Sequence, residues 1–312
     1  MDQGPLQNQA LQQEFQDIGS SLTHDTLFRE MFQWLGLAKA FLRLVLSEPV
    51  LAKLDFDRLT IEPRDFLSVI FKETRADMIY RVPILGREES LCIYVLLEHK
   101  SFNDYFTIFQ ADQYADQISL REYRQAAEEK RLNVDFRLSP VLVIVFHHGE
   151  RAFTGPMDVA GVYDDCDGVL ADYLPHRRGI LFDLNTLPEL PDDPEVPELY
   201  AVLRIMQVIF GLDISTKVRE VLERLKPHSE VPKYRRLIRF LWWYFVNNAR
   251  KESHQGVMTV TDAVKKTIGE KGMSMVLETL KAEGEAKGKV LAALEQRFNG
   301  VPPEVEDSIR SM

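Results

Sequence analysis

The sequence predicts a mixed α/β domain followed by a helical region. Three observations support this fold class: short apolar segments rich in β-branched residues, helical spacing of apolar residues around them, and a Pro- and acid-rich segment beyond which the pattern is helical. With 312 residues the chain is long enough for two domains. We expect a flexible tail over residues 1–21, a first domain over 22–186, a linker over 187–197 and a helical accessory region over 198–312.

The first domain begins with helical spacing and changes to a hairpin pattern. Apolar residues recur every three or four positions over residues 23–46, and Glu48-Pro49 is expected to end the second of two helices. A strand-like pattern follows over residues 66–84. A polar turn at 86–90 separates it from an apolar run at 91–97, which predicts two antiparallel strands.

The rest of the chain alternates helix and strand before it becomes helical. Residues 104–130 have helical composition, PVLVIVF at 140–146 is typical of a strand buried on both faces, and GILFDL at 179–184 is a further strand candidate. In the C-terminal region, KYRRLIRFLWWYF at 233–245 interleaves basic and aromatic residues. An amphipathic core helix explains this segment better than a nucleic-acid surface does.

Composition excludes several classes of function. Lys and Arg total 38 against 48 for Asp and Glu, and the net charge of -10 argues against coating of nucleic acid, although a local basic groove stays possible. Cys92 and Cys166 form neither a disulfide framework nor a zinc set. No signal peptide, membrane-length apolar run or phosphate-binding loop is recognisable, so we expect a cytoplasmic protein with no membrane partner and no nucleotide cofactor.

The apolar stretch CIYVLLEHKSF at 92–102 ends with three consecutive ionisable residues, Glu98, His99 and Lys100. Side chains alternate across a strand, so Glu98 and Lys100 share one face and His99 lies on the other. If the hairpin turns near residues 87 and 88, paired positions sum to about 175. Asp77 then stands opposite Glu98, with the two Cβ atoms about 5 Å apart.

Two carboxylates at this spacing repel each other, and a hard divalent cation relieves the repulsion. Mg²⁺ suits such ligands and keeps water molecules that can act as the nucleophile, and Mn²⁺ can substitute. Lys100 would stabilise the charge that develops on a phosphate or help to deprotonate the water. Gln110 and Gln113 lie on the following helix. The pattern is compatible with metal-dependent phosphodiester hydrolysis, but a surface Glu-Lys ion pair is the simpler explanation, and the pattern alone leaves both open.

A second group of ionisable residues follows the buried strand at 140–146. His147 and His148 are adjacent, and neighbouring residues of a strand face opposite ways, so the two cannot bind one ion there. We expect a structural or loop role for both.

Four sequence blocks, in order, resemble a known family: THDTLFREMF, RADMIYRV, YVLLEHKSF and PVLVIVFHHGE resemble the bacterial recombination-promoting nuclease/putative transposase family of the PD-(D/E)XK nuclease superfamily. The resemblance covers about residues 22–185. It implies a restriction-endonuclease-like core of helix, three strands, helix and strand. It also implies metal-binding acids at Asp77 and Glu98, a catalytic lysine at Lys100, DNA as substrate, and a part in recombination or mobile-element biology.

The chain departs from the family pattern at two positions, Lys100 and Gln110. Many members of the family that this chain resembles carry Gln at the position of Lys100. The lysine of this chain matches the Glu-x-Lys form that is general in the superfamily. Many also carry Arg in place of Gln110, and its loss removes an expected phosphate contact. Tyr114 matches a family tyrosine and is expected, with Gln110, to bind substrate. Asp25 matches a recurrent family position and either contacts the metal or caps the first helix.

The sequence therefore predicts a Mg²⁺-dependent DNA endonuclease. Asp77 and Glu98 bind the metal, Lys100 stabilises the transition state or activates water, and Gln110 or Gln113 positions substrate or metal. A homodimer would serve cleavage of both strands. The alternative is a catalytically inactive nuclease-fold module that binds DNA or protein, which the acidic net charge and the missing Arg favour.

Overall fold

The computed structural model describes residues 24–62, 78–86, 92–100, 102–187, 190, 196–211, 214–248, 256 and 259–269. Contacts divide the chain into two compact units. The sheet unit is Phe28–Pro191, and the helical unit is Met1–Leu27 together with Asp192–Met312. The chain passes from one unit to the other inside the Pro- and acid-rich segment 187–197.

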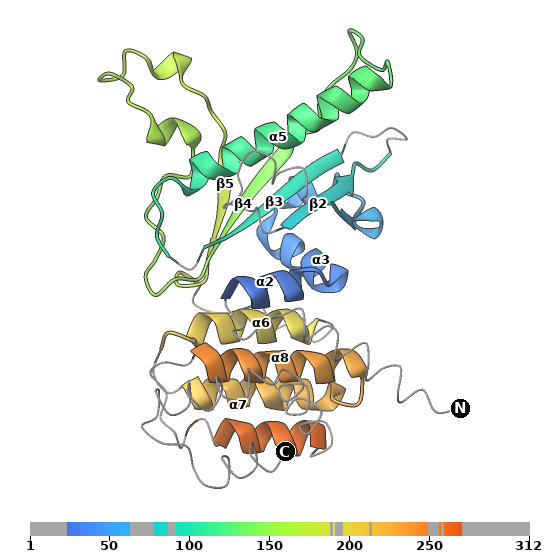
Figure 1. Cartoon of the computed structure of the whole chain (residues 1–312), viewed down its shortest axis with the longest axis vertical. Coiled ribbons are helices and arrows are strands. Elements are labelled where there is room, and N and C mark those ends of the chain that lie inside the picture. Colours follow the sequence, from blue (N-terminus) through green and yellow to red (C-terminus); the bar gives the residue numbers. More distant parts are fainter. Residues whose placement is uncertain are drawn as a thin grey trace, which may run out of the picture. The chain divides into compact units, whose positions relative to one another are not determined.

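The sheet unit contains a five-stranded mixed sheet in the order β1-β2-β3-β4-β5 (Figure 1). Its strands are β1 (Thr60–Ile61), β2 (Met78–Pro83), β3 (Cys92–Lys100), β4 (Val141–His147) and β5 (Gly179–Asp183). The pairs β1–β2 and β2–β3 are antiparallel, whereas β3–β4 and β4–β5 are parallel. Helix α5 (Thr107–Glu128) makes the crossover that parallel neighbours require between β3 and β4. The predicted mixed α/β class is confirmed.

Helices precede and accompany the sheet. The N-terminal ones are α2 (His24–Phe32), α3 (Leu35–Val45), the single turn α4 (Glu48–Leu51) and η1 (Phe56–Arg58). The expected stop at Glu48-Pro49 was wrong in detail, because α3 ends at Val45 and Pro49 lies in the first turn of α4. Proline is tolerated there, since a first-turn N–H has no partner within the helix.

One face of the sheet is filled by aromatic rings. Phe146 of β4 lies at the centre, with ring centroids 5.1 Å from Phe28, 5.6 Å from Phe41 and 5.3 Å from Phe182. The Tyr80 hydroxyl of β2 donates a hydrogen bond of 2.7 Å to the carbonyl oxygen of Phe32. It therefore satisfies a carbonyl at the end of α2 that has no partner within the helix.

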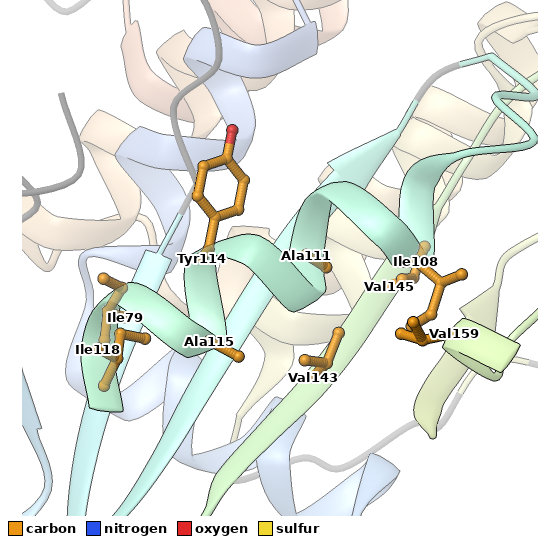
Figure 2. Packing of buried hydrophobic residues seen from close by; sticks show 9 residues of the cluster. All are labelled: Ile79, Ile108, Ala111, Tyr114, Ala115, Ile118, Val143, Val145 and Val159. Atoms are coloured by element: carbon orange, nitrogen blue, oxygen red, sulfur yellow. The ribbon is translucent and has the colours of Figure 1, made fainter. Parts of the chain in front are cut away.

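The other face of the sheet is covered by α5. The buried side chains between helix and sheet form one cluster (Figure 2): Ile79, Ile108, Ala111, Tyr114, Ala115, Ile118, Val143, Val145 and Val159. Gly179 at the start of β5 permits the close approach, because a Cβ at this position would lie 2.8 Å from Cδ1 of Ile108. Strand β4 is thus buried on both faces from Val143 to His147, as its uninterrupted apolar sequence predicts.

The connection from β4 to β5 is long and carries two short helical turns, η3 (Val159–Val162) and η4 (Ala171–Tyr173). Arg177 near its end binds α5, where its guanidinium hydrogen-bonds the Asp112 carboxylate and lies 3.0 Å from Oδ1 of Asp116. Burial raises the pKa of Asp112, and the positive charge of Arg177 opposes that rise. This ion pair anchors the connection to the helix.

The helical unit is built on α6 (Pro197–Val208), α7 (Ile214–Leu225), η5 (Lys226–His228), α8 (Pro232–Asn248) and a further helical segment over residues 259–269. The apolar residues of α8 from Leu237 to Phe245 are buried, and Arg239 among them is only 7% exposed. The preferred reading of this segment as a core helix is confirmed. No helix within the described ranges is long and apolar enough to cross a membrane.

Glu198, in the first turn of α6, is a buried carboxylate of the helical unit. It is 3% exposed, accepts a 2.9 Å hydrogen bond from the Tyr234 hydroxyl, and forms an ion pair with Lys233. Burial, together with the adjacent Glu198 charge, raises the pKa of Tyr234 to about 12. The network fastens the start of α8 to the start of α6.

Candidate functional site

The predicted site depends on the register of the β2–β3 hairpin. Met78 pairs with Leu97, Tyr80 with Val95 and Pro83 with Cys92, so the paired numbers sum to 175 throughout the described hairpin. This is the register predicted from the sequence. Asp77, the residue before β2, lies outside the described residues, and its pairing with Glu98 stays a prediction.

The end of β3 lies next to β4 in the sheet. The strand runs through Lys100. Glu98, His99 and Lys100 are therefore part of the strand itself. Glu98 stands at the register position of Val145, and Lys100 stands at that of His147. The structure describes the backbone of β3, so these residues are placed by register alone.

The faces of the sheet follow from residues whose side chains are described. Ile79 packs beneath α5, and its partner in β3 is position 96. Positions two apart on a strand share a face, so positions 98 and 100 belong to the face that α5 covers. His99 instead shares its register position with Phe146, which faces the aromatic cluster on the opposite side. The predicted division between Glu98 and Lys100 on one face and His99 on the other therefore agrees with the register.

Helix α5 carries the predicted substrate contacts. The side-chain amide of Gln110 donates a 3.1 Å hydrogen bond to Oδ2 of Asp104, which holds it at the start of the helix. Gln113 is half-buried one turn further on. Tyr114 is 2% exposed and belongs to the core cluster, and Figure 2 shows its hydroxyl pointing away from the aliphatic side chains of that cluster. The ring of Tyr114 thus has a packing role that the family pattern did not indicate.

Asp25 is the second residue of α2, because the helix begins at His24. It therefore lies in the first turn of the helix. The side chain of Asp25 lies outside the described part, so both a metal contact and a capping role stay predictions.

His147 and His148 are buried at the end of β4, with exposed fractions of 0% and 1%. Nε2 of His147 lies 2.7 Å from the carbonyl oxygen of Arg151, and its ring packs 5.4 Å from that of Phe153. These contacts support the structural role expected for His147. Within the described residues, no three His, Cys, Asp or Glu side chains are grouped so that they could hold a metal ion.

Sequence reasoning missed Asp183, the last residue of β5. It pairs in register with His147, which in turn pairs with Lys100, so the ends of three parallel strands carry ionisable residues in one row. The Asp183 carboxylate is 4% exposed and accepts hydrogen bonds from the backbone N–H of Phe153 at 2.7 Å and of Asn185 at 2.9 Å. Its signal in the sequence was an Asp at the end of an apolar strand with Asn two residues later, which is typical of a turn.

Many family members carry an Arg at the position of Gln110 on this helix. Within the described residues, no Arg from another segment ion-pairs with α5 at that position. The guanidinium of Arg177 does contact α5, but it forms ion pairs with Asp112 and Asp116. Within the described residues, α5 therefore presents amides and an aromatic ring at positions 110, 113 and 114.

The family assignment agrees with this arrangement of strands and helix. No curated protein and no solved structure matches the chain significantly. The sequence profile of a family described as "Putative transposase, YhgA-like" matches residues 22–235, which includes the β2–β3 hairpin, α5 and the start of the helical unit. This match spans more than half of the chain, and the protein belongs to the YhgA-like putative transposase family.

Proposed function

We propose that this chain is a metal-dependent DNA endonuclease with a PD-(D/E)XK core, acting in recombination or on mobile elements. The hairpin register carries the proposal. If the pairing sum of 175 continues by one position beyond Met78, Asp77 would stand opposite Glu98, at a separation that would suit one shared divalent cation. Membership of a transposase-like family supports DNA as the partner.

The order of elements also supports such a core. Helix α3 is followed by β1, β2 and β3, then by α5, and then by β4, which returns parallel to β3. This is the order of helix, three strands, helix and strand that the family resemblance implies. Ligands of open α/β sheets tend to bind at the carboxyl ends of the strands, where Glu98 and Lys100 stand on β3.

The donor set fits magnesium. Asp77 and Glu98 would offer carboxylate oxygens, the ligands that Mg²⁺ prefers, and Mn²⁺ accepts the same ligands. Bound there, the ion would supply Lewis-acid stabilisation and lower the pKa of a water molecule. Lys100, two positions beyond Glu98 on the same face, would place positive charge beside the scissile phosphate or take the proton of the water. Gln113 or Gln110 of α5 would orient the substrate or the ion.

The test is cleavage of supercoiled plasmid by the full chain with Mg²⁺ or Mn²⁺, and with EDTA as the metal-free condition. We expect nicked or linear product with either metal, none with EDTA, and at least about a hundredfold loss of rate in Asp77→Ala and Glu98→Ala. Asp172→Ala is the matched control, since it removes an exposed carboxylate of η4 in the same unit. It should cleave at the wild-type rate.

Two outcomes would count against the proposal. A wild-type protein that leaves the plasmid intact while it still binds DNA would favour the catalytically inactive binding module. Equal cleavage by the wild type and both alanine variants would mean that the residues are misassigned or that another nuclease is present. Binding of Mn²⁺, measured by titration calorimetry, separates these cases because it reports on the two carboxylates without requiring turnover.

A further inference from the structure

Three large aromatic side chains are exposed directly after β3, in residues 102–106, which we call the aromatic loop. Phe102 is 62% exposed, Tyr105 is 54% exposed and Phe106 is 52% exposed. Folded proteins bury most side chains of this kind, because each ring gains free energy when it leaves water. A contiguous group of exposed rings therefore indicates a surface that is covered by something else in function.

The backbone of the aromatic loop is held in place by its two polar residues. The Asn103 amide donates a 2.8 Å hydrogen bond to the carbonyl of Ala152, and its Oδ1 accepts one of 2.9 Å from the N–H of Thr154. Oδ1 of Asp104 accepts a hydrogen bond from the backbone N–H of Phe106 at 3.0 Å. The backbone carbonyl oxygen of Asp104 accepts one from the Thr107 hydroxyl at 2.8 Å. These hydrogen bonds fix the backbone of the loop while its three rings stay more than half exposed.

The aromatic surface continues onto the turn η3. The Tyr105 hydroxyl donates a 2.9 Å hydrogen bond to the carbonyl of Gly161, and the rings of Phe109 and Tyr163 meet edge to face at 6.3 Å. Tyr163 is itself 44% exposed. Arg151, which precedes Ala152, the hydrogen-bond partner of Asn103, is exposed.

We infer that the aromatic loop is a stacking surface for unpaired bases of the DNA strand that enters the site. The inference rests on the proposed function and names a substrate class for it, DNA with a locally single-stranded or unstacked segment. Every base has a π face, so aromatic rings bind bases without reading their sequence. The loop begins two residues after Lys100, so a base stacked here belongs to a nucleotide close to the scissile phosphate.

The acidic charge near this surface disfavours phosphate contacts, so stacking would have to supply most of its affinity for DNA. The chain carries a net charge of -10, and the connection that bears η3 continues into Asp164, Asp165 and Asp167. A surface that depended on phosphate contacts would need clustered cations in place of these acids. Binding of unpaired DNA by the aromatic loop should therefore depend less on salt concentration than binding through many phosphate contacts does.

The test measures binding in EDTA, where no cleavage interferes. The probe is a labelled duplex with a short single-stranded gap that contains a fluorescent purine analogue, compared with the fully paired duplex of the same sequence. We expect the wild type to prefer the gapped DNA. Phe102→Leu/Phe106→Leu should lose about tenfold or more of its affinity for the gap and less than about twofold for the duplex. Phe102→Tyr/Phe106→Tyr, which keeps both rings, should bind within about twofold of the wild type.

Several results would overturn the inference: no preference of the wild type for gapped DNA, equal loss in the leucine and tyrosine variants, or wild-type affinity of a leucine variant with an unchanged circular dichroism spectrum. Failure of the proposed function is distinguishable. A protein that prefers gapped DNA but does not cleave plasmid would contradict the proposed nuclease activity and support the stacking surface. A protein that cleaves plasmid without this preference would support the nuclease activity and contradict the stacking surface.

Discussion

The Tyr234–Glu198 hydrogen bond lends itself to a quantitative test, because the tyrosine hydroxyl can be both removed by substitution and titrated. Tyr234→Phe deletes only the hydroxyl that donates to the buried Glu198 carboxylate. Hydrogen bonds to charged groups contribute about 1.5–3 kcal/mol, so the free energy of unfolding should fall by that amount at pH 8.

The raised pKa of Tyr234, whose largest cause is burial and whose second is the hydrogen bond to Glu198, predicts how the stability changes with pH. Its pKa is about 12 in the folded chain against 10.0 as the ordinary value, and each unit corresponds to about 1.4 kcal/mol. Because the folded-state pKa lies above the unfolded one, the stabilisation is complete below pH 10 and is lost as the pH rises to 12, by about 2–3 kcal/mol in all. The stability advantage of the wild type over Tyr234→Phe at pH 8 should therefore shrink by about 2–3 kcal/mol as the pH rises to 12.

The assay is denaturant unfolding between pH 8 and pH 12, followed by tryptophan fluorescence in a Trp34→Phe background. The remaining tryptophans, Trp242 and Trp243, both lie on α8 and report on the helical unit. Tyr80 and Tyr244, whose pKa values burial also raises, are present in both proteins and cancel in the difference. A difference between wild type and variant that is equal at pH 8 and pH 12 would refute the reasoning.

A double-mutant cycle identifies the partner. In a Glu198→Gln background the acceptor is neutral, so Tyr234→Phe should cost only about 0.5–1.5 kcal/mol at pH 8. An unchanged cost in this background would mean that the tyrosine stabilises the unit through packing and not through the carboxylate.

Two further predictions concern the sheet unit. Phe146→Ala should lower its free energy of unfolding by about 3–5 kcal/mol, since the ring is fully buried among other aromatic rings, and Phe146→Leu should cost less than half of that; chemical denaturation measures both. Asn103→Ala should leave the thermal midpoint almost unchanged but weaken binding of gapped DNA severalfold, because the aromatic loop loses its two bonds to residues 152 and 154; unchanged affinity would show that the rings need no fixed backbone.

Local pattern was enough to predict the hairpin and its register. The turn residues fix where the chain reverses, and a fixed turn determines every pair beyond it, which is why the sum of 175 follows from the sequence. The buried strand β4 was equally predictable, since only a strand covered on both faces tolerates an uninterrupted apolar run. β3 continues through Lys100, so it includes the three ionisable positions to which strand alternation was applied in the sequence.

Features that depend on distant residues could not be read from the sequence. β1 has only two residues and owes its existence to pairing with β2. The hydrogen bonds of Asp183 likewise arise from chain segments brought together by the fold. For the proposed site, the register supports the positions of Glu98 and Lys100, whereas Asp77 and the side chains of β3 lie outside the described residues.

The edges of the sheet have a consequence for the behaviour of the protein at high concentration. Within the described residues, strand β1 at one edge is only two residues long, and β5 at the other is bridged at its start, where Gly179 donates to the carbonyl of Met157 and Val159 donates to that of Arg177. An edge with unpaired N–H and C=O groups invites strands of other molecules and leads to aggregation. The short β1 and the bridge at the start of β5 both reduce the length of free edge that another molecule could pair with.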